Sequence, residues 1–151
     1  ILKLLKILYE QSTRHMIIIG KRLAQLEYLH KVFIETIGTD AGLVVGNALS
    51  KKKKLEREEA LTQRVVFGSE KIVKLGLDIT RMDTLVTISG TSDQITFQQA
   101  IGRICRDHPD KNDPMAYFFV DNKIGIYQGM FKKLIRMCKK YNYKFMERSI
   151  T

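Results

Sequence analysis

The chain has 151 residues, 44% of them hydrophobic and 28% charged, which is enough for one domain with a real core and too few for two. Its net charge of +10, from 26 Lys and Arg against 16 Asp and Glu, favours a polyanionic partner, nucleic acid before an anionic membrane, although a basic domain without such a partner has the same charge. Neither a disulfide framework nor a membrane span is indicated, because Cys105 and Cys138 have no paired spacing and the longest apolar run is MIIIG.

Helical and strand patterns alternate through the first half of the chain. Leucines at helical spacing predict amphipathic helices over residues 1–12 and 23–33. Short apolar runs predict buried strands at residues 15–20, 41–46 and 64–68. Between the last two strands, the charged residues 47–63 predict a loop that leads into an exposed helical stretch. A further helix is expected over residues 69–75.

The alternation continues through the second half. Strands are expected at residues 83–89 and 115–120, and between them a helix over residues 93–106 with Asp93 as its N-cap. A basic amphipathic helix over residues 124–141 follows, and residues 143–149 are expected to add an edge strand. This order predicts a single α/β domain over residues 1–151, an open parallel sheet with helices on both faces and ligands at the carboxyl ends of its strands.

Two short motifs carry the strongest functional signal. The stretch QAIGRICR, residues 99–106, has the spacing Q-x-x-G-R-x-x-R, and LGLDI, residues 75–79, precedes it by about twenty residues. They resemble motifs VI and V of the superfamily 2 helicases, and HMIIIGKRLAQLEYLHKVF, residues 15–33, resembles motif IV. The resemblance covers almost the whole chain and is closest to the helicases of large DNA viruses and phages.

The resemblance implies a RecA-like second lobe that binds ATP in a cleft shared with a first lobe. Arg106 would be the arginine finger on the γ-phosphate, with Arg103 beside it on one helix face, since planar cations stabilise the charge that spreads over the transferred phosphoryl group. The Gln99 amide would reach the nucleotide or a neighbouring loop. Gly102 would let another backbone come close. Gly76 and Asp78 would form the second element of the nucleotide site, in which Asp78 contacts the ribose side of the nucleotide or orients an arginine.

Each of these residues also has a plainer interpretation. The arginines could be solvated on an exposed helix, and Asp78 could be a capping residue in a glycine turn. The Ser69 hydroxyl could bind a nucleic-acid phosphate, cap a helix, or do both.

A basic surface near the end of the chain is the second candidate site. It consists of Lys132, Lys133, Arg136, Lys139 and Lys140. Contact with nucleic-acid phosphates is the interpretation that the expected polyanionic partner favours, and a solvated helix face is the alternative. Tyr127, Tyr141 and Tyr143 could stack on bases or border the core. The lysine run at residues 51–54 fits phosphate contact and a solvated face equally well.

The motifs that bind the phosphates and magnesium in such helicases are missing from this sequence. It has neither the Walker A pattern G-x-x-x-x-G-K-[ST] nor a DExx box, and no metal site is assigned. Because the chain also begins with Ile1 in a helical pattern, we expect a piece of a longer protein whose first lobe holds most of the contacts to ATP and Mg²⁺. The piece alone should bind ATP poorly and hydrolyse none.

The predicted function is therefore the second lobe of an ATP-dependent helicase that acts on DNA or RNA, with no membrane partner. A non-enzymatic, basic nucleic-acid-binding or regulatory module is the alternative. A metabolic nucleotide-binding domain is the weakest, because the chain lacks a Gly-rich phosphate fingerprint. The unpaired cysteines suggest an intracellular, reducing compartment. If the viral resemblance holds, that is the host cytoplasm or the virion, and a role in transcription or genome processing follows.

Overall fold

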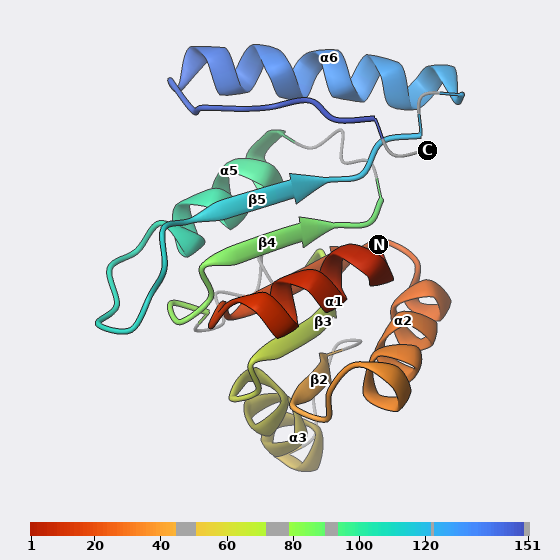
Figure 1. Cartoon of the computed structure of the whole chain (residues 1–151), viewed down its shortest axis with the longest axis vertical. Coiled ribbons are helices and arrows are strands. Elements are labelled where there is room, and N and C mark those ends of the chain that lie inside the picture. Colours follow the sequence, from red (N-terminus) through yellow and green to blue (C-terminus); the bar gives the residue numbers. More distant parts are fainter. Residues whose placement is uncertain (45–50, 72–78, 90–93, 122, 150–151) are drawn as a thin grey trace.

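A computed structural model describes residues 1–44, 51–71, 79–89, 94–121 and 123–149. In these residues, five parallel strands form one sheet: β1 (Met16–Gly20), β2 (Ala41–Val44), β3 (Val65–Ser69), β4 (Thr84–Thr87) and β5 (Met115–Phe118). Their order in the sheet is β2-β3-β1-β4-β5 (Figure 1). The predicted open parallel sheet is confirmed.

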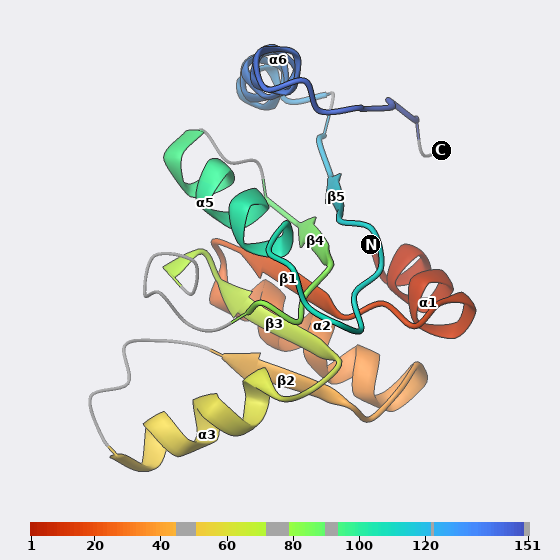
Figure 2. The same ribbon diagram turned by 90° about the vertical axis from the view of Figure 1, so that its left-hand side faces the viewer.

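Helices cover both faces of this sheet (Figure 2). Those described are α1 (Leu2–Gln11), α2 (Leu23–Thr36), α3 (Lys51–Leu61), α5 (Gln94–Ile104) and α6 (Gly125–Lys140). The pair α1 and α2 lies on one face, α3 and α5 lie on the other, and α6 runs beyond β5. Among these segments, none of the helices has the length and apolar character that a bilayer-crossing segment needs.

Alternate residues of each strand supply two separate hydrophobic cores. Along β1, Met16 and Ile18 pack under α1 and α2 with Phe33 and Phe67, whereas Ile17 and Ile19 pack against the α5 side. All four β1 side chains are at most 3% exposed. A strand with both faces covered needs apolar residues at every position, which explains the unbroken MIII run.

The segment after α6 is not the predicted edge strand, and that prediction was wrong. Residues 143–149 have no regular secondary structure, and all of them are exposed. Asn142 takes a left-handed conformation with φ of 60°, and the Tyr143 N–H donates to the Cys138 carbonyl (2.9 Å). This C-cap turns the chain back beside α6 (Figure 1), so it does not continue the sheet at β5.

Polar side chains gather where the strands begin. The Asp83 carboxylate is fully buried and accepts hydrogen bonds from the Thr84 hydroxyl (2.8 Å) and from the backbone and side-chain amides of Asn112 (3.1 and 3.0 Å). The Arg14 guanidinium lies 3.6 Å from the same carboxylate and donates to the Asp113 carbonyl (2.9 Å). The residues before β1, β4 and β5 are therefore joined through one buried charge.

A second arginine fixes α1 to the start of β3. Arg64 donates to the carbonyls of Arg14 and Tyr9, at 2.9 Å each, and its guanidinium lies 4.4 Å from the centre of the Tyr9 ring. The Tyr9 hydroxyl donates in turn to Asp40, before β2. Helix α1 is thus bonded to the segments that precede β2 and β3.

Removal of the buried carboxylate should destabilise the chain strongly. We expect Asp83→Ala to lower the free energy of unfolding by about 3 kcal/mol or more, because the Arg14 guanidinium would lose its counter-charge and the Asn112 backbone N–H would lose its acceptor. Urea unfolding followed by circular dichroism measures the change. The control is Asp110→Ala in the exposed loop, expected to stay within about 0.5 kcal/mol of wild type. Equal losses in the two variants would contradict this role of Asp83.

Candidate functional site

The outward face of α5 carries most of the predicted nucleotide residues. Gln99 and Gly102 are exposed and Arg103 is half-buried. The opposite face of the helix is buried in the core through Phe97, Ala100, Ile101 and Ile104. The predicted residues therefore share the side of α5 that faces away from the core.

Arg106 lies just beyond this helix, so the prediction that both arginines share a helical face was only partly right. Helix α5 ends at Ile104, and the Arg106 N–H donates to the Arg103 carbonyl (3.3 Å) in the turn that follows. The Lys111 ammonium donates to the carbonyls of Ile104 and Arg106, at 2.6 Å each. Because these bonds satisfy the carbonyls at the helix end, the backbone turns there and the helix stops short of residue 106.

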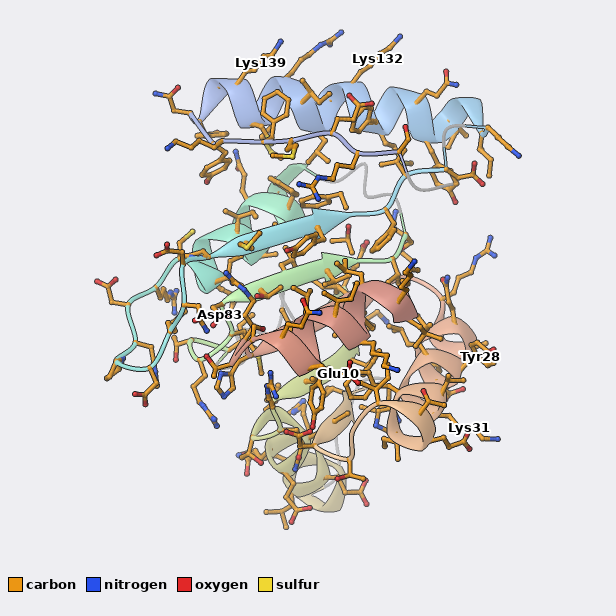
Figure 3. The ribbon with its side chains drawn as sticks, in the orientation of Figure 1. Glu10, Tyr28, Lys31, Asp83, Lys132 and Lys139 are labelled. Carbon is orange, nitrogen blue, oxygen red and sulfur yellow. The ribbon has the colours of Figure 1, made fainter. Side chains whose placement is uncertain are left out.

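The turn of residues 103–106, the arginine turn, lies at the amino-terminal edge of the sheet. Ligands were expected to gather at the carboxyl edge instead. The turn lies at the amino-terminal edge because α5 runs back against the direction of the strands, so its end comes close to where they begin (Figure 1). Asp83, at that edge, bonds to Asn112 of the loop that follows the turn (Figure 3). The other predicted nucleotide residues, Gly76 and Asp78, lie outside the described residues, as does the predicted N-cap Asp93.

No packing requirement within the described residues explains the glycine on this face. A Cβ added to Gly102 would have none of their atoms within 4 Å. Glycine inside a helix costs about 1 kcal/mol relative to alanine. Its presence on an open helix face is consistent with close approach by a surface outside this chain.

Ser69 lies at the other edge of the sheet. It is the last residue of β3, half-buried and in register with Gly20 of β1, rather than the first residue of a helix. Beside it, the Lys21 N–H donates to the Ser89 hydroxyl oxygen (3.1 Å). Lys21 and Arg22 are exposed at the start of α2. Sequence reasoning missed these two cations, although a basic pair directly after a buried strand was a usable signal.

The basic residues of α6 all point to solvent. Lys132, Lys133, Arg136, Lys139 and Lys140 are exposed, and Figure 3 shows Lys132 and Lys139 directed away from the sheet. On the opposite side Met137 is buried, but Ile126 is 71% exposed. The first turn of α6 extends past the end of β5 (Figure 1).

The tyrosines of α6 and of the segment that follows it do not all occupy the same environment. Tyr127 is half-buried against an apolar groove with Phe118 and Val120, which is the plainer interpretation of this tyrosine. Tyr141 and Tyr143 are exposed, with ring centres 6.1 Å apart, and the Tyr141 hydroxyl accepts a hydrogen bond from Gln98 of α5. The Lys140 ammonium lies 5.5 Å from the centre of the Tyr141 ring. The C-cap residue of α6 is thus bonded to α5, the helix that carries Arg103.

The two best-formed pockets in the described part of the chain are too small for a nucleotide, and neither is lined by the predicted nucleotide residues. The groove between β5 and α6 has a cavity volume of about 20 Å³, enough for about one water molecule. Among the residues that the structure describes, no three His, Cys, Asp or Glu side chains lie close enough together to form a metal site. The candidate residues thus form open surfaces, which suits contact with a partner better than enclosure of a ligand.

Comparison with known proteins identifies the family. The family model described as helicase conserved C-terminal domain matches residues 1–108. No curated protein sequence matches the chain.

Solved structures share the fold at low sequence identity. The C-terminal domain of the DEAD-box protein Dbp5 has a TM-score of 0.71 and 18% identity over 97% of this chain and 81% of its own. The yeast DEAD-box splicing factor Prp28 has a TM-score of 0.75 and 16% identity over 97% of this chain and 31% of its own. The C-terminal part of the Fun30 ATPase domain has a TM-score of 0.67 and 15% identity over 87% of this chain.

The chain spans only 42% of that Fun30 structure, so the similarity concerns one lobe of larger proteins. These likenesses show a RecA-like fold, and the match of the family model covers more than half of the sequence. The chain therefore belongs to the family of helicase conserved C-terminal domains.

Proposed function

We propose that this chain is the second motor lobe of an ATP-dependent superfamily 2 helicase or translocase. Residues 1–151 form this lobe, and the Walker A and B motifs lie on a first lobe of the same protein. The observation that carries the proposal is the outward face of α5, where Gln99, Gly102 and Arg103 lead to Arg106 with no enclosed pocket of their own. Such a surface becomes a nucleotide site only when a second surface closes on it.

In this proposal the arginine turn acts across the cleft between the lobes. Arg106 contacts the γ-phosphate and Arg103 lies beside it, where guanidinium groups stabilise charge that develops during phosphoryl transfer. Gly102 admits the backbone of the first lobe, and Gln99 reaches the nucleotide or a neighbouring loop. We expect Gly76 and Asp78 to complete the nucleotide site, with Asp78 in contact with the ribose side of the nucleotide or orienting an arginine. Mg²⁺ neutralises phosphate charge when bound, and we expect the first lobe to hold it.

Nucleic acid is the proposed partner of two surfaces. At the carboxyl edge of the sheet, Ser69 with Lys21 and Arg22 offers a hydroxyl and two cations to a phosphate backbone. On α6, the five exposed cations lie along one helix, and Tyr141 and Tyr143 offer rings to bases. Phosphate contacts read no sequence, which suits a motor that steps along DNA or RNA.

The biological setting stays a prediction. We propose that the parent protein is a helicase of the kind found in large DNA viruses and phages, with a role in transcription or genome processing. The expected compartment is intracellular and reducing, in the host cytoplasm or the virion.

Loss of the proposed finger should abolish turnover but not binding. In the protein that contains both lobes, we expect Arg106→Ala to lower kcat for nucleic-acid-stimulated ATP hydrolysis by about a thousandfold or more, with unchanged affinity for nucleic acid. Arg148→Ala, in the exposed tail, is the matched control and should keep wild-type kcat. Full activity of Arg106→Ala would reject the finger assignment. A wild-type protein that binds nucleic acid but hydrolyses no ATP would favour the non-enzymatic module.

Neutralisation of α6 should weaken binding in a salt-dependent way. We expect the double variant Lys132→Gln, Lys139→Gln to bind single-stranded oligonucleotide more weakly, with the slope of log affinity against log salt smaller by roughly 0.7 for each phosphate that the variant no longer neutralises. Fluorescence anisotropy over a range of salt concentrations measures this slope. The control removes the same charge from α1 and α2, by Lys6→Gln with Lys31→Gln, and should leave the slope unchanged. An equally reduced slope in both double variants would assign binding to net charge alone.

A further inference from the structure

The loop that follows α5 returns to hold the end of that helix. Its Lys111 ammonium donates to the carbonyls of Ile104 and Arg106, which flank Cys105 in the turn. Both distances are 2.6 Å, as expected for charge-assisted hydrogen bonds. The backbone of Lys111 is tied locally as well, because its N–H donates to the His108 carbonyl (3.2 Å).

The same loop is anchored to the buried core. Asn112, directly after Lys111, gives both its backbone and its side-chain amide to the Asp83 carboxylate (3.1 and 3.0 Å). Asp83 is itself fixed by Thr84 and Arg14. A continuous set of bonds therefore runs from the rigid start of β4, through Asn112 and Lys111, to the arginine turn.

The surroundings of Lys111 agree with this geometry. Burial lowers the pKa of its ammonium, whereas Asp83, Cys105 and Asp107 act in the opposite direction. The ammonium is thus partly withdrawn from water, among groups that come from both the core and the turn. A half-buried lysine directed at two carbonyls restricts the turn more than a solvated one would.

We propose that Lys111 is a positioning residue for Arg103 and Arg106, a role that rests on the proposed function. It holds the turn in one conformation before the lobes close, so the guanidinium groups need no rearrangement when charge develops on the phosphate. Preorganisation of this kind lowers the barrier of the chemical step rather than strengthening the binding of ATP. Lys111 touches neither ATP nor a reacting atom in this account.

The first test needs no activity. Amide hydrogen exchange by NMR on this chain reports opening of the turn through the Cys105 and Arg106 N–H groups, which donate to the Ile101 and Arg103 carbonyls. We expect both to exchange about tenfold faster in Lys111→Met. The Leu26 N–H, which donates to the Arg22 carbonyl in α2, should not change. Lys111→Arg should restore slow exchange, and Lys31→Met on α2 should behave as wild type. Unchanged exchange in Lys111→Met would overturn the proposal.

The second test separates positioning from simple helix capping. In the protein with both lobes, we expect Lys111→Met to lower kcat for nucleic-acid-stimulated ATP hydrolysis about ten- to a hundredfold, with KM for ATP nearly unchanged and with recovery in Lys111→Arg. Faster exchange with wild-type kcat would reduce Lys111 to a helix cap and overturn the proposal. Absence of ATP hydrolysis in the wild type would instead reject the proposed function, and the inference with it, before any variant is compared.

Discussion

The carboxylate of Asp83 has no contact with solvent, and its bonds to Arg14, Thr84 and Asn112 determine how the amino-terminal edge of the sheet is organised. A buried charge is tolerated only when it is paired and fully hydrogen-bonded, so the three segments that meet there have little freedom to move apart. The segments are those that precede β1, β4 and β5. Through Asn112 and Lys111 this constraint extends to the turn with Arg106, so the proposed catalytic residue is fixed to a fully buried carboxylate.

The direction of α5 explains why the candidate residues divide between two edges. A helix that connects parallel strands begins near the end of one strand and returns toward the start of the next. Residues at its end, such as Arg103, therefore lie at the amino-terminal edge, while Ser69 at the end of β3 lies at the carboxyl edge. A motor lobe can then contact nucleotide and nucleic acid on separate surfaces, with the sheet as a rigid body between them.

The sequence predicts the sheet well because burial on both faces leaves a strong local pattern. The run MIII in β1 could be assigned from its unbroken apolar character and α2 from the spacing of its leucines, and the motif of α5 indicated the family. Ends set by distant contacts could not be found in this way. The stop at Ile104 depends on Lys111, and the direction of residues 143–149 depends on a left-handed Asn142. Neither interaction has a periodic signature.

The site was predictable to the extent that its residues are adjacent in sequence. Gln99, Gly102 and Arg103 follow one helix, so their shared outward face followed from spacing. The roles of Asp83 and Arg14 arise from a contact between residues far apart in the chain. The adjacent cations Lys21 and Arg22 lie beside Ser69 because β1 pairs with β3, and spacing along the chain does not show this proximity.

The central claim is that this chain is half of an ATP-driven motor, and ATP hydrolysis by the chain alone and by the protein with both lobes tests it most directly. Each should be assayed with and without single-stranded nucleic acid. The account predicts no hydrolysis by the chain alone and nucleic-acid-stimulated hydrolysis by the two-lobe protein. Robust hydrolysis by the isolated chain would contradict it, because a lobe without a phosphate-binding loop would then contain a complete active site.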